Sequence, residues 1–358
     1  MTKIFDLSKR ELRSSLWIFV FLMMGLLNSC SDEYEGVPIE KNNIYNLETP
    51  SGFPKMTFDL TGNPITINGI ALGKKLFYEG RLSRNNTISC GFCHIQEYAF
   101  THHGHNVSHG IDDRLGIRNA PAVQNMAFLS RFTWDGVGHS LDERSLVAIT
   151  DAKEMDSSLP EAVGKLNTDS NYTKMFKAAF GDENITGERI LKALSQFMAT
   201  MISADSKYDR VKKGQATFTG QETQGLLLFQ NKCASCHSGE LFTDESFRNT
   251  GMYYNSQFAD RGRYRVTLDW NDNMKFRVPS LRNIEHTAPY MHDGRFYTLD
   301  AVMNFYSDNV EDQPNLDPLL KQNGHIGIPM TSQEKQNIIT FLKTLSDNSF
   351  ITNPKFAE

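Results

Sequence analysis

Two short cysteine and histidine motifs carry the clearest chemistry in this sequence. They are the pentapeptides Cys90-Gly-Phe-Cys93-His94 and Cys233-Ala-Ser-Cys236-His237. Two thiols at this spacing can form thioethers with the vinyl groups on one porphyrin edge, and the adjacent histidine can ligate the iron. The pattern therefore predicts two covalently bound haem c groups, with His94 and His237 as the proximal iron ligands.

Other uses of these four cysteines explain the sequence less well. A structural zinc site takes four Cys or His ligands, but it does not require a histidine directly after the second cysteine in both copies. A thioredoxin-like redox pair needs a βαβ context, which the sequence lacks. Two disulfides would suit an exported protein, but they leave the repeated histidine unexplained.

The fifth cysteine, Cys30, follows an N-terminal export signal. Basic residues precede the apolar stretch 16–27, which is too short to span a bilayer. The stretch leads into Leu27-Asn-Ser-Cys30, which resembles a bacterial lipobox. We therefore expect residues 1–29 to be a lipoprotein signal peptide and residues 30–50 to be a tether that begins at an acylated Cys30. The alternative is an ordinary signal peptide with an incidental cysteine. Either reading predicts an exported protein, and the lipobox predicts a periplasmic one anchored to a membrane by lipid.

Composition excludes several other classes of protein. Hydrophobic residues make up 39% of the 358 residues and charged residues 22%, which is typical of a globular chain and too apolar for a disordered one. The 37 Lys and Arg residues against 42 Asp and Glu residues give a net charge of −5. No basic footprint for nucleic acid is present, so we expect no nucleic-acid partner.

Helices are expected to position the two motifs. Each motif follows a similar short segment, Gly73-Lys-Lys-Leu-Phe77 in the first half and Gly225-Leu-Leu-Leu-Phe229 in the second. This weak internal repeat predicts a helix before each haem. Residues 188–201 place apolar side chains on one helical face, and Thr331 with Glu334 forms a capping box that begins another helix.

These elements predict a mainly α-helical fold of two cytochrome c-like domains, each with one covalently bound c-type haem. The length of the chain also favours two domains. We expect the N-terminal haem domain over residues 51–204 and the C-terminal one over residues 222–358. The polar segment 205–221 is the predicted linker.

Further motifs resemble those of the di-haem cytochrome c peroxidase family, in the family's order over residues 50–347. They are Arg118-Asn-Ala-Pro121, Trp134-Asp-Gly136, Glu154-Met155, Phe276-Arg-Val-Pro-Ser-Leu-Arg-Asn283 and Thr287-Ala-Pro-Tyr-Met-His-Asp-Gly294. The resemblance implies an oxidoreductase, a cytochrome-c peroxidase, that reduces hydrogen peroxide with electrons from a small c-type cytochrome or similar donor. It also implies a peroxidatic N-terminal haem and an electron-transfer C-terminal haem. Many family members form dimers, so a homodimer is compatible with the resemblance.

The resemblance assigns roles around the peroxidatic haem. Glu154 matches the distal acid, which moves a proton between the peroxide oxygens, and Trp134 matches an aromatic residue between the haems. The alternatives are a surface glutamate and a core tryptophan. His109 resembles a distal histidine that caps the iron at rest. His102, His103 and His105 are rivals for that role, and solvated loop histidines are the alternative.

The resemblance also implies a calcium site between the domains. Asn119, Thr287 and Pro289 match its ligands, and one side-chain carbonyl with two main-chain carbonyls suits a hard cation. Arg277 and His292 match family positions near the propionates or the haem edge, and their roles stay open.

One position departs from the best-known peroxidase branch, where a methionine is the second axial ligand of the C-terminal haem. Tyr306 occupies this position and resembles the MauG branch of the family. A phenolate is hard and anionic and stabilises oxidised iron, whereas a thioether favours the reduced state. Met303 and Met291 are alternative ligands. Tyr306 therefore motivates a second hypothesis, a MauG-like peroxide-dependent oxidase of a protein substrate. A non-catalytic di-haem electron carrier is the third.

Overall fold

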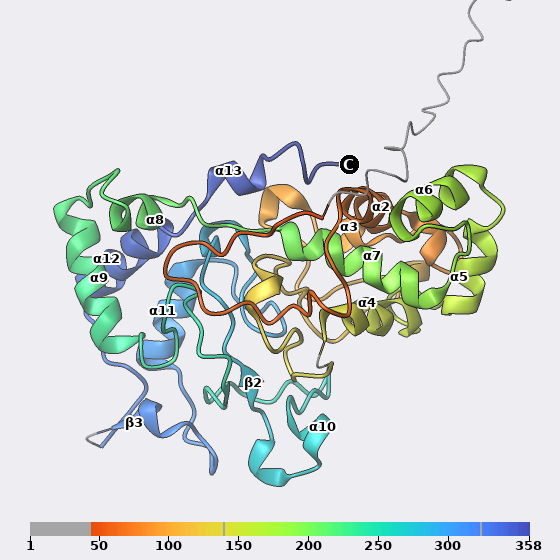
Figure 1. Ribbon diagram of the computed structural model, residues 1–358. Coiled ribbons are helices and arrows are strands. Elements are labelled where there is room, and N and C mark those ends of the chain that lie inside the picture. Colours follow the sequence, from red (N-terminus) through yellow and green to blue (C-terminus); the bar gives the residue numbers. More distant parts are fainter. Residues whose placement is uncertain (1–43, 139, 323) are drawn as a thin grey trace, which may run out of the picture. The chain divides into compact units, whose positions relative to one another are not determined.

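The structure is a computed structural model that describes residues 44–138, 140–322 and 324–358. These residues belong to one compact unit. They are mainly helical, as predicted (Figure 1). The predicted signal peptide and Cys30 lie outside the described residues. At the end of the predicted tether, the backbone N–H of Tyr45 donates to the carbonyl of Ile65 at 2.8 Å. None of the described helices is long and apolar enough to cross a membrane.

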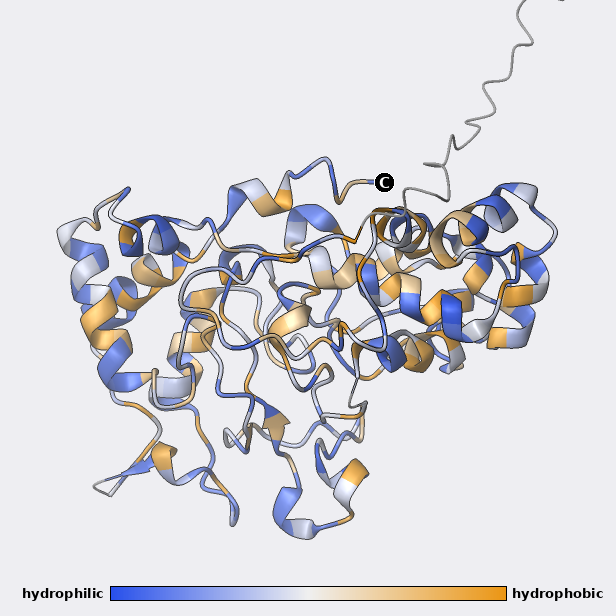
Figure 2. Cartoon of the chain, in the orientation of Figure 1, coloured by the Kyte–Doolittle hydropathy of each residue, from blue (hydrophilic) through white to orange (hydrophobic). Residues whose placement is uncertain are grey.

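Helices of eight or more residues form most of the framework. They are α2 (Ile67–Phe77), α4 (Leu141–Thr150), α5 (Leu159–Leu166), α6 (Ser170–Phe180), α7 (Gly187–Thr200), α9 (Gly220–Lys232), α11 (Leu299–Asp308) and α12 (Ser332–Lys343). Shorter α-helices are α3 (Cys90–Cys93), α8 (Lys207–Lys212), α10 (Tyr264–Thr267) and α13 (Asn348–Ile351). Hydrophobic and hydrophilic residues alternate around the longer helices (Figure 2), as expected for helices with one buried face.

Short 3₁₀ turns and two small β-ribbons connect the helices. The turns are η2 (Gly80–Leu82), η3 (Gln96–Tyr98), η4 (Ile111–Asp113), η5 (Met126–Phe128), η6 (Trp270–Asp272), η7 (Ile284–His286) and η8 (Pro318–Leu320). Strand β1 (Phe247–Arg248) pairs antiparallel with β2 (Phe276–Arg277), and β3 (Lys321–Gln322) pairs antiparallel with β4 (His325–Ile326).

The N-terminal half is built on the crossing of α2 and α7. A Cβ at Gly73 would lie 1.9 Å from the backbone carbonyl oxygen of Ala193, so only glycine permits this close approach. Helix α7 confirms the helix predicted from the apolar face of residues 188–201. It begins after Thr186, whose side chain accepts a hydrogen bond from the N–H of Arg189.

The C-terminal half repeats this arrangement with α9 and α12, which lie side by side (Figure 1). A Cβ at Gly225 would lie 2.0 Å from the carbonyl oxygen of Asn337. The capping box of Thr331 and Glu334 is present, which confirms the predicted start of α12. The repeated Gly-x-x-x-Phe segment therefore has the same structural role in both halves. In each half it belongs to a helix that precedes the haem motif and crosses the last long helix of that half.

Replacing Gly225 by Ala is expected to destabilise the protein by about 1–3 kcal/mol, because the added methyl forces α9 and α12 apart. Chemical denaturation of the haem-loaded protein measures this loss in the free energy of unfolding. Gly220→Ala is the matched control in the same helix, since a Cβ there meets no atom within 4 Å. Equal stability of the two variants would contradict the role assigned to the crossing.

Two segments connect the halves more closely than a flexible linker would. The predicted linker contains α8, whose Asp209 is buried and pairs with the buried Arg282. The chain after α12 returns to the N-terminal half, where Phe350 and Phe356 pack on Phe100 with ring centroids 5.5 and 6.4 Å apart.

Candidate active site

The first haem motif forms the short helix α3. The Ser89 side chain accepts from the N–H of Phe92 and caps this helix. The Nδ1 of His94 donates to the carbonyl oxygen of Phe100 at 2.7 Å, which leaves Nε2 free to ligate iron. Burial lowers the pKa of His94 to about 4, so the ring is neutral at pH 7, the form that binds a metal.

The second motif has the same local geometry. It begins directly after α9, and the Nδ1 of His237 donates to the carbonyl oxygen of Phe242 at 3.1 Å. Burial again lowers the pKa of the histidine. Cys90, Cys93, Cys233 and Cys236 are all free thiols, so these cysteines form no disulfide in the structure. Each motif thus presents two thiols and one neutral, oriented imidazole.

A cavity of about 590 Å³ opens beside the second motif. Its lining includes Cys233, Cys236, His237, Met291, Met303 and Tyr306. Arg277 also faces this cavity, and burial lowers the pKa of its guanidinium to about 10. Within the described ranges no carboxylate lies within 4 Å of Arg277 to balance its charge. A buried cation beside an apolar cavity fits a haem, because a propionate can supply the missing negative charge.

The candidate axial ligands of the second haem all line this cavity. Tyr306 and Met303 lie one turn apart on α11, and Met291 lies in the loop before it. Burial, and then the charges of Cys236 and Cys233, raise the pKa of the Tyr306 phenol, so a phenolate there requires a cationic partner. Tyr306 remains the ligand that the sequence predicts.

Glu154 lies near the first motif. Burial raises the pKa of its carboxyl, and the charge of Arg144 opposes this shift. Burial first and the charge of Glu154 second raise the pKa of Cys93 to about 12, so the carboxyl lies near the thiols of the first motif. The N–H of Ile111 donates to the carbonyl oxygen of Glu154 at 2.8 Å. The loop that carries His109 therefore packs directly on the backbone of Glu154.

Arg144 is a candidate residue that sequence reasoning missed. It projects from α4, and its Nη1 is buried without a hydrogen-bond partner among the described residues. Its charge lowers the pKa of both Glu154 and Cys90, so the guanidinium faces the first haem site. The sequence offered one signal for Arg144, a basic residue in a helix that ends shortly before the predicted acid. This pattern is too common to single out a residue.

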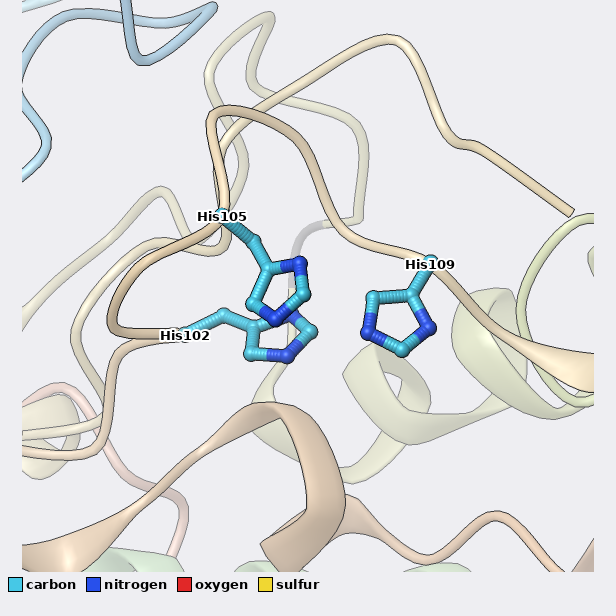
Figure 3. A group of neighbouring side chains, drawn as sticks. All are labelled: His102, His105 and His109. Carbon is cyan, nitrogen blue, oxygen red and sulfur yellow. The ribbon is translucent and has the colours of Figure 1, made fainter. Parts of the chain in front are cut away.

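The four loop histidines separate into two environments. His102, His105 and His109 gather within ring-centroid distances of 4.3–4.9 Å (Figure 3). His103 points elsewhere and stacks on Tyr98 at 3.8 Å. His109 also packs against Phe92 of the first motif at 5.2 Å. Its predicted role as an iron cap stays a prediction.

Trp134 lies where the two halves meet. Its indole N–H donates to the carbonyl oxygen of Asn119 at 2.9 Å, and its own carbonyl accepts from the N–H of Arg277 at 2.8 Å. It also lines the cavity of the second motif. Arg118 supports this contact region through ion pairs with Asp135 and Asp260, both at 2.6 Å. The predicted place of Trp134 between the two haems stays a prediction.

The predicted calcium ligands lie in the same region. Asn119, Thr287 and Pro289 all line the cavity. The N–H of Asn119 donates to the carbonyl oxygen of His292 at 2.7 Å, and the His292 ring stacks on Phe276 at 3.6 Å. The three residues thus line one cavity, and calcium binding stays a prediction.

Comparison with known proteins places these features in a family. The model of the family described as "Di-haem cytochrome c peroxidase" matches residues 68–217. The methylamine utilization protein MauG of Methylorubrum extorquens is 33% identical over 304 residues, which are 82% of each chain. The cytochrome c551 peroxidase of Nitrosomonas europaea is 33% identical over 77% of this chain and 79% of its own.

A solved structure agrees with these relatives. A MauG-like protein associated with microbial copper homeostasis superposes with a TM-score of 0.79 at 34% identity, over 87% of this chain and 99% of that chain. The chain therefore belongs to the di-haem cytochrome c peroxidase family, and this membership implies two haem c groups.

Proposed function

We propose that the protein is a peroxidase that reduces hydrogen peroxide to two waters, with two electrons from a c-type cytochrome or similar donor. The observation that carries this proposal is the grouping of His94, Glu154 and Arg144 at the first motif. An electron carrier needs no proton-transfer group beside its haem, whereas peroxide cleavage is accelerated by one. Relatives named as cytochrome c peroxidases support the same activity.

The residues of the first site have separate roles in the cleavage of peroxide. A bound haem iron supplies the redox chemistry that breaks the O–O bond. Glu154 accepts a proton from one peroxide oxygen and delivers it to the other, so that water is the leaving group. Arg144 donates a hydrogen bond that stabilises negative charge developing on the peroxide. His94 is held by Phe100 in the tautomer that leaves Nε2 free for the iron.

The same proposal covers the rest of the molecule. His237 would hold the haem that takes in electrons, His94 would hold the haem where peroxide is reduced, and Trp134 would help electrons pass from one to the other. The two haem domains span residues 51–204 and 222–358, and Asn119, Thr287 and Pro289 hold calcium between them. Residues 1–29 and Cys30 direct a lipid-anchored protein to the periplasm.

Turnover of the haem-loaded protein tests this proposal. Peroxide consumption is measured against oxidation of a reduced small cytochrome c, with an expected ratio of one peroxide to two donor molecules. A protein whose two haem spectra do not change when peroxide is added would be an electron carrier, and the proposal would be wrong.

Tyr306 favours a second candidate function, a MauG-like oxidation of a protein side chain. A haem ligated by phenolate is a poor store for one electron, so it suits sharing of oxidising equivalents between the haems. The visible and EPR spectra of the oxidised protein decide between the two. A Met-to-iron charge-transfer band favours the peroxidase. A low-spin haem without this band, together with reaction of the fully oxidised protein with peroxide, favours the oxidase.

Replacing Arg144 by Gln is expected to lower the rate of peroxide turnover by about tenfold, the effect of losing one charged hydrogen-bond donor. The pH profile gives a second readout. Because the charge of Arg144 lowers the pKa of Glu154, its loss shifts the acid limb of kcat/KM to higher pH. Arg189→Gln is the control, since Arg189 pairs with Asp182 away from the site. An unchanged profile in Arg144→Gln would remove Arg144 from the mechanism.

A further inference from the structure

Three imidazoles converge on one point of the loop between the first haem motif and Arg118. The ligating nitrogens of His102, His105 and His109 all lie within 4.8 Å of one another. Figure 3 shows the three rings turned toward a common space. Rings from a single loop that meet in this way form a ready ligand set for one metal ion.

The backbone holds the three histidines in place. His102 follows Thr101, which forms an isolated β-bridge with Ile95. His109 forms a second isolated β-bridge, with Leu115. Between them, the side-chain amide of Asn119 donates to the carbonyl oxygen of His105 at 3.3 Å. Each ligand therefore comes from a fixed position, so little order has to be gained on binding.

One buried nitrogen of the cluster also lacks a hydrogen-bond partner among the described residues. His102 is only 3% exposed, and its Nδ1 has no hydrogen-bond partner among the described residues. Buried polar atoms normally have a partner. His105 is exposed, so an ion can reach the cluster from solvent. A metal ion would supply the partner that His102 lacks.

The ligand types select the metal. Three imidazoles suit copper or zinc, whereas calcium and magnesium prefer oxygen ligands. In the described part of the chain, the only carboxylate within 4 Å of these rings is Asp113, 3.8 Å from the Nδ1 of His109, and its side chain is 98% exposed. Divalent affinities peak at copper. We propose that His102, His105 and His109 form a binding site for one copper ion.

The site lies beside the first haem motif. The carbonyl oxygen of His109 is 3.6 Å from the Sγ of Cys93. An ion held by His109 keeps this imidazole engaged, so copper binding and capping of the first haem iron by His109 exclude each other. Metal binding is measured without peroxide, so the site stands or falls independently of the proposed function.

Copper titration of the haem-loaded protein tests the site, with His103→Ala as the matched control. Chelator-treated protein is titrated with Cu(II) against a competing chelator, and its EPR spectrum is recorded for hyperfine coupling to nitrogen. We expect about one equivalent to bind, with His105→Ala weakening affinity at least about tenfold and His103→Ala leaving it unchanged. His105 is exposed, so its loss should leave the fold intact.

Three results would overturn the proposal. The first is a haem-loaded protein that binds no copper. The second is equal weakening by His105→Ala and His103→Ala, which would indicate adventitious binding by surface histidines. The third is tighter binding of Zn(II) than of Cu(II) in the same competition assay, which would assign the site to zinc.

Discussion

Replacing Glu154 by Gln is expected to lower kcat for peroxide turnover by about 10²- to 10⁴-fold, the usual contribution of a positioned proton-transfer group. The amide has the shape of the carboxyl but cannot accept a proton. Steady-state turnover with a reduced cytochrome donor measures the loss, and the visible spectra should show both haems attached. Glu143→Gln is the matched control, because Glu143 is an exposed carboxyl on the neighbouring helix α4.

The pH profile distinguishes a proton-transfer role from a structural one. Burial raises the pKa of Glu154 above its ordinary value of 4.5, and the group acts first as a base. Activity should therefore fall as the pH drops through this raised pKa, and Glu154→Gln should lack that acid limb. If the variant retained the wild-type rate or the same acid limb, another group would be the base.

The features predicted correctly from sequence are those that depend on local patterns. The apolar face of α7 and the capping box of α12 each occupy a short stretch whose spacing alone fixes the geometry. The shared segments around Gly73 and Gly225 were also visible as a repeat. Their meaning as helix crossings depends on the carbonyls of Ala193 and Asn337, which are far away in sequence.

The features that sequence reasoning missed depend on contacts between distant residues. Arg144 becomes a candidate only because the fold buries its Nη1 and places its charge near Glu154. The histidines were noted individually, but their convergence requires the bridge of His109 to Leu115 and the hydrogen bond of Asn119 to His105. The polar composition of residues 205–221 suggested a solvated connector. It gave no indication that Asp209 is buried.

Asp209 gives the largest expected effect on stability. Replacing it by Asn should cost about 3–5 kcal/mol, because the fully buried guanidinium of Arg282 loses the charge that compensates it. The two side chains form paired hydrogen bonds of 2.8 and 2.9 Å, and they connect α8 to the C-terminal half. Chemical denaturation of the haem-loaded protein measures the loss. Asp205→Asn is the control, since that side chain is 49% exposed and lies 3.5 Å from Arg210.

The pH dependence of this loss tests its electrostatic origin. Burial alone would raise the pKa of Asp209, but hydrogen bonds and the charge of Arg282 lower it below the ordinary value. A lowered pKa in the folded state stabilises the protein above the unfolded pKa, and this contribution disappears as the pH falls through the folded pKa. The difference in stability between wild type and Asp209→Asn should therefore shrink in acid. A difference that stays constant down to low pH would mean that packing, not charge, makes the connection between the halves.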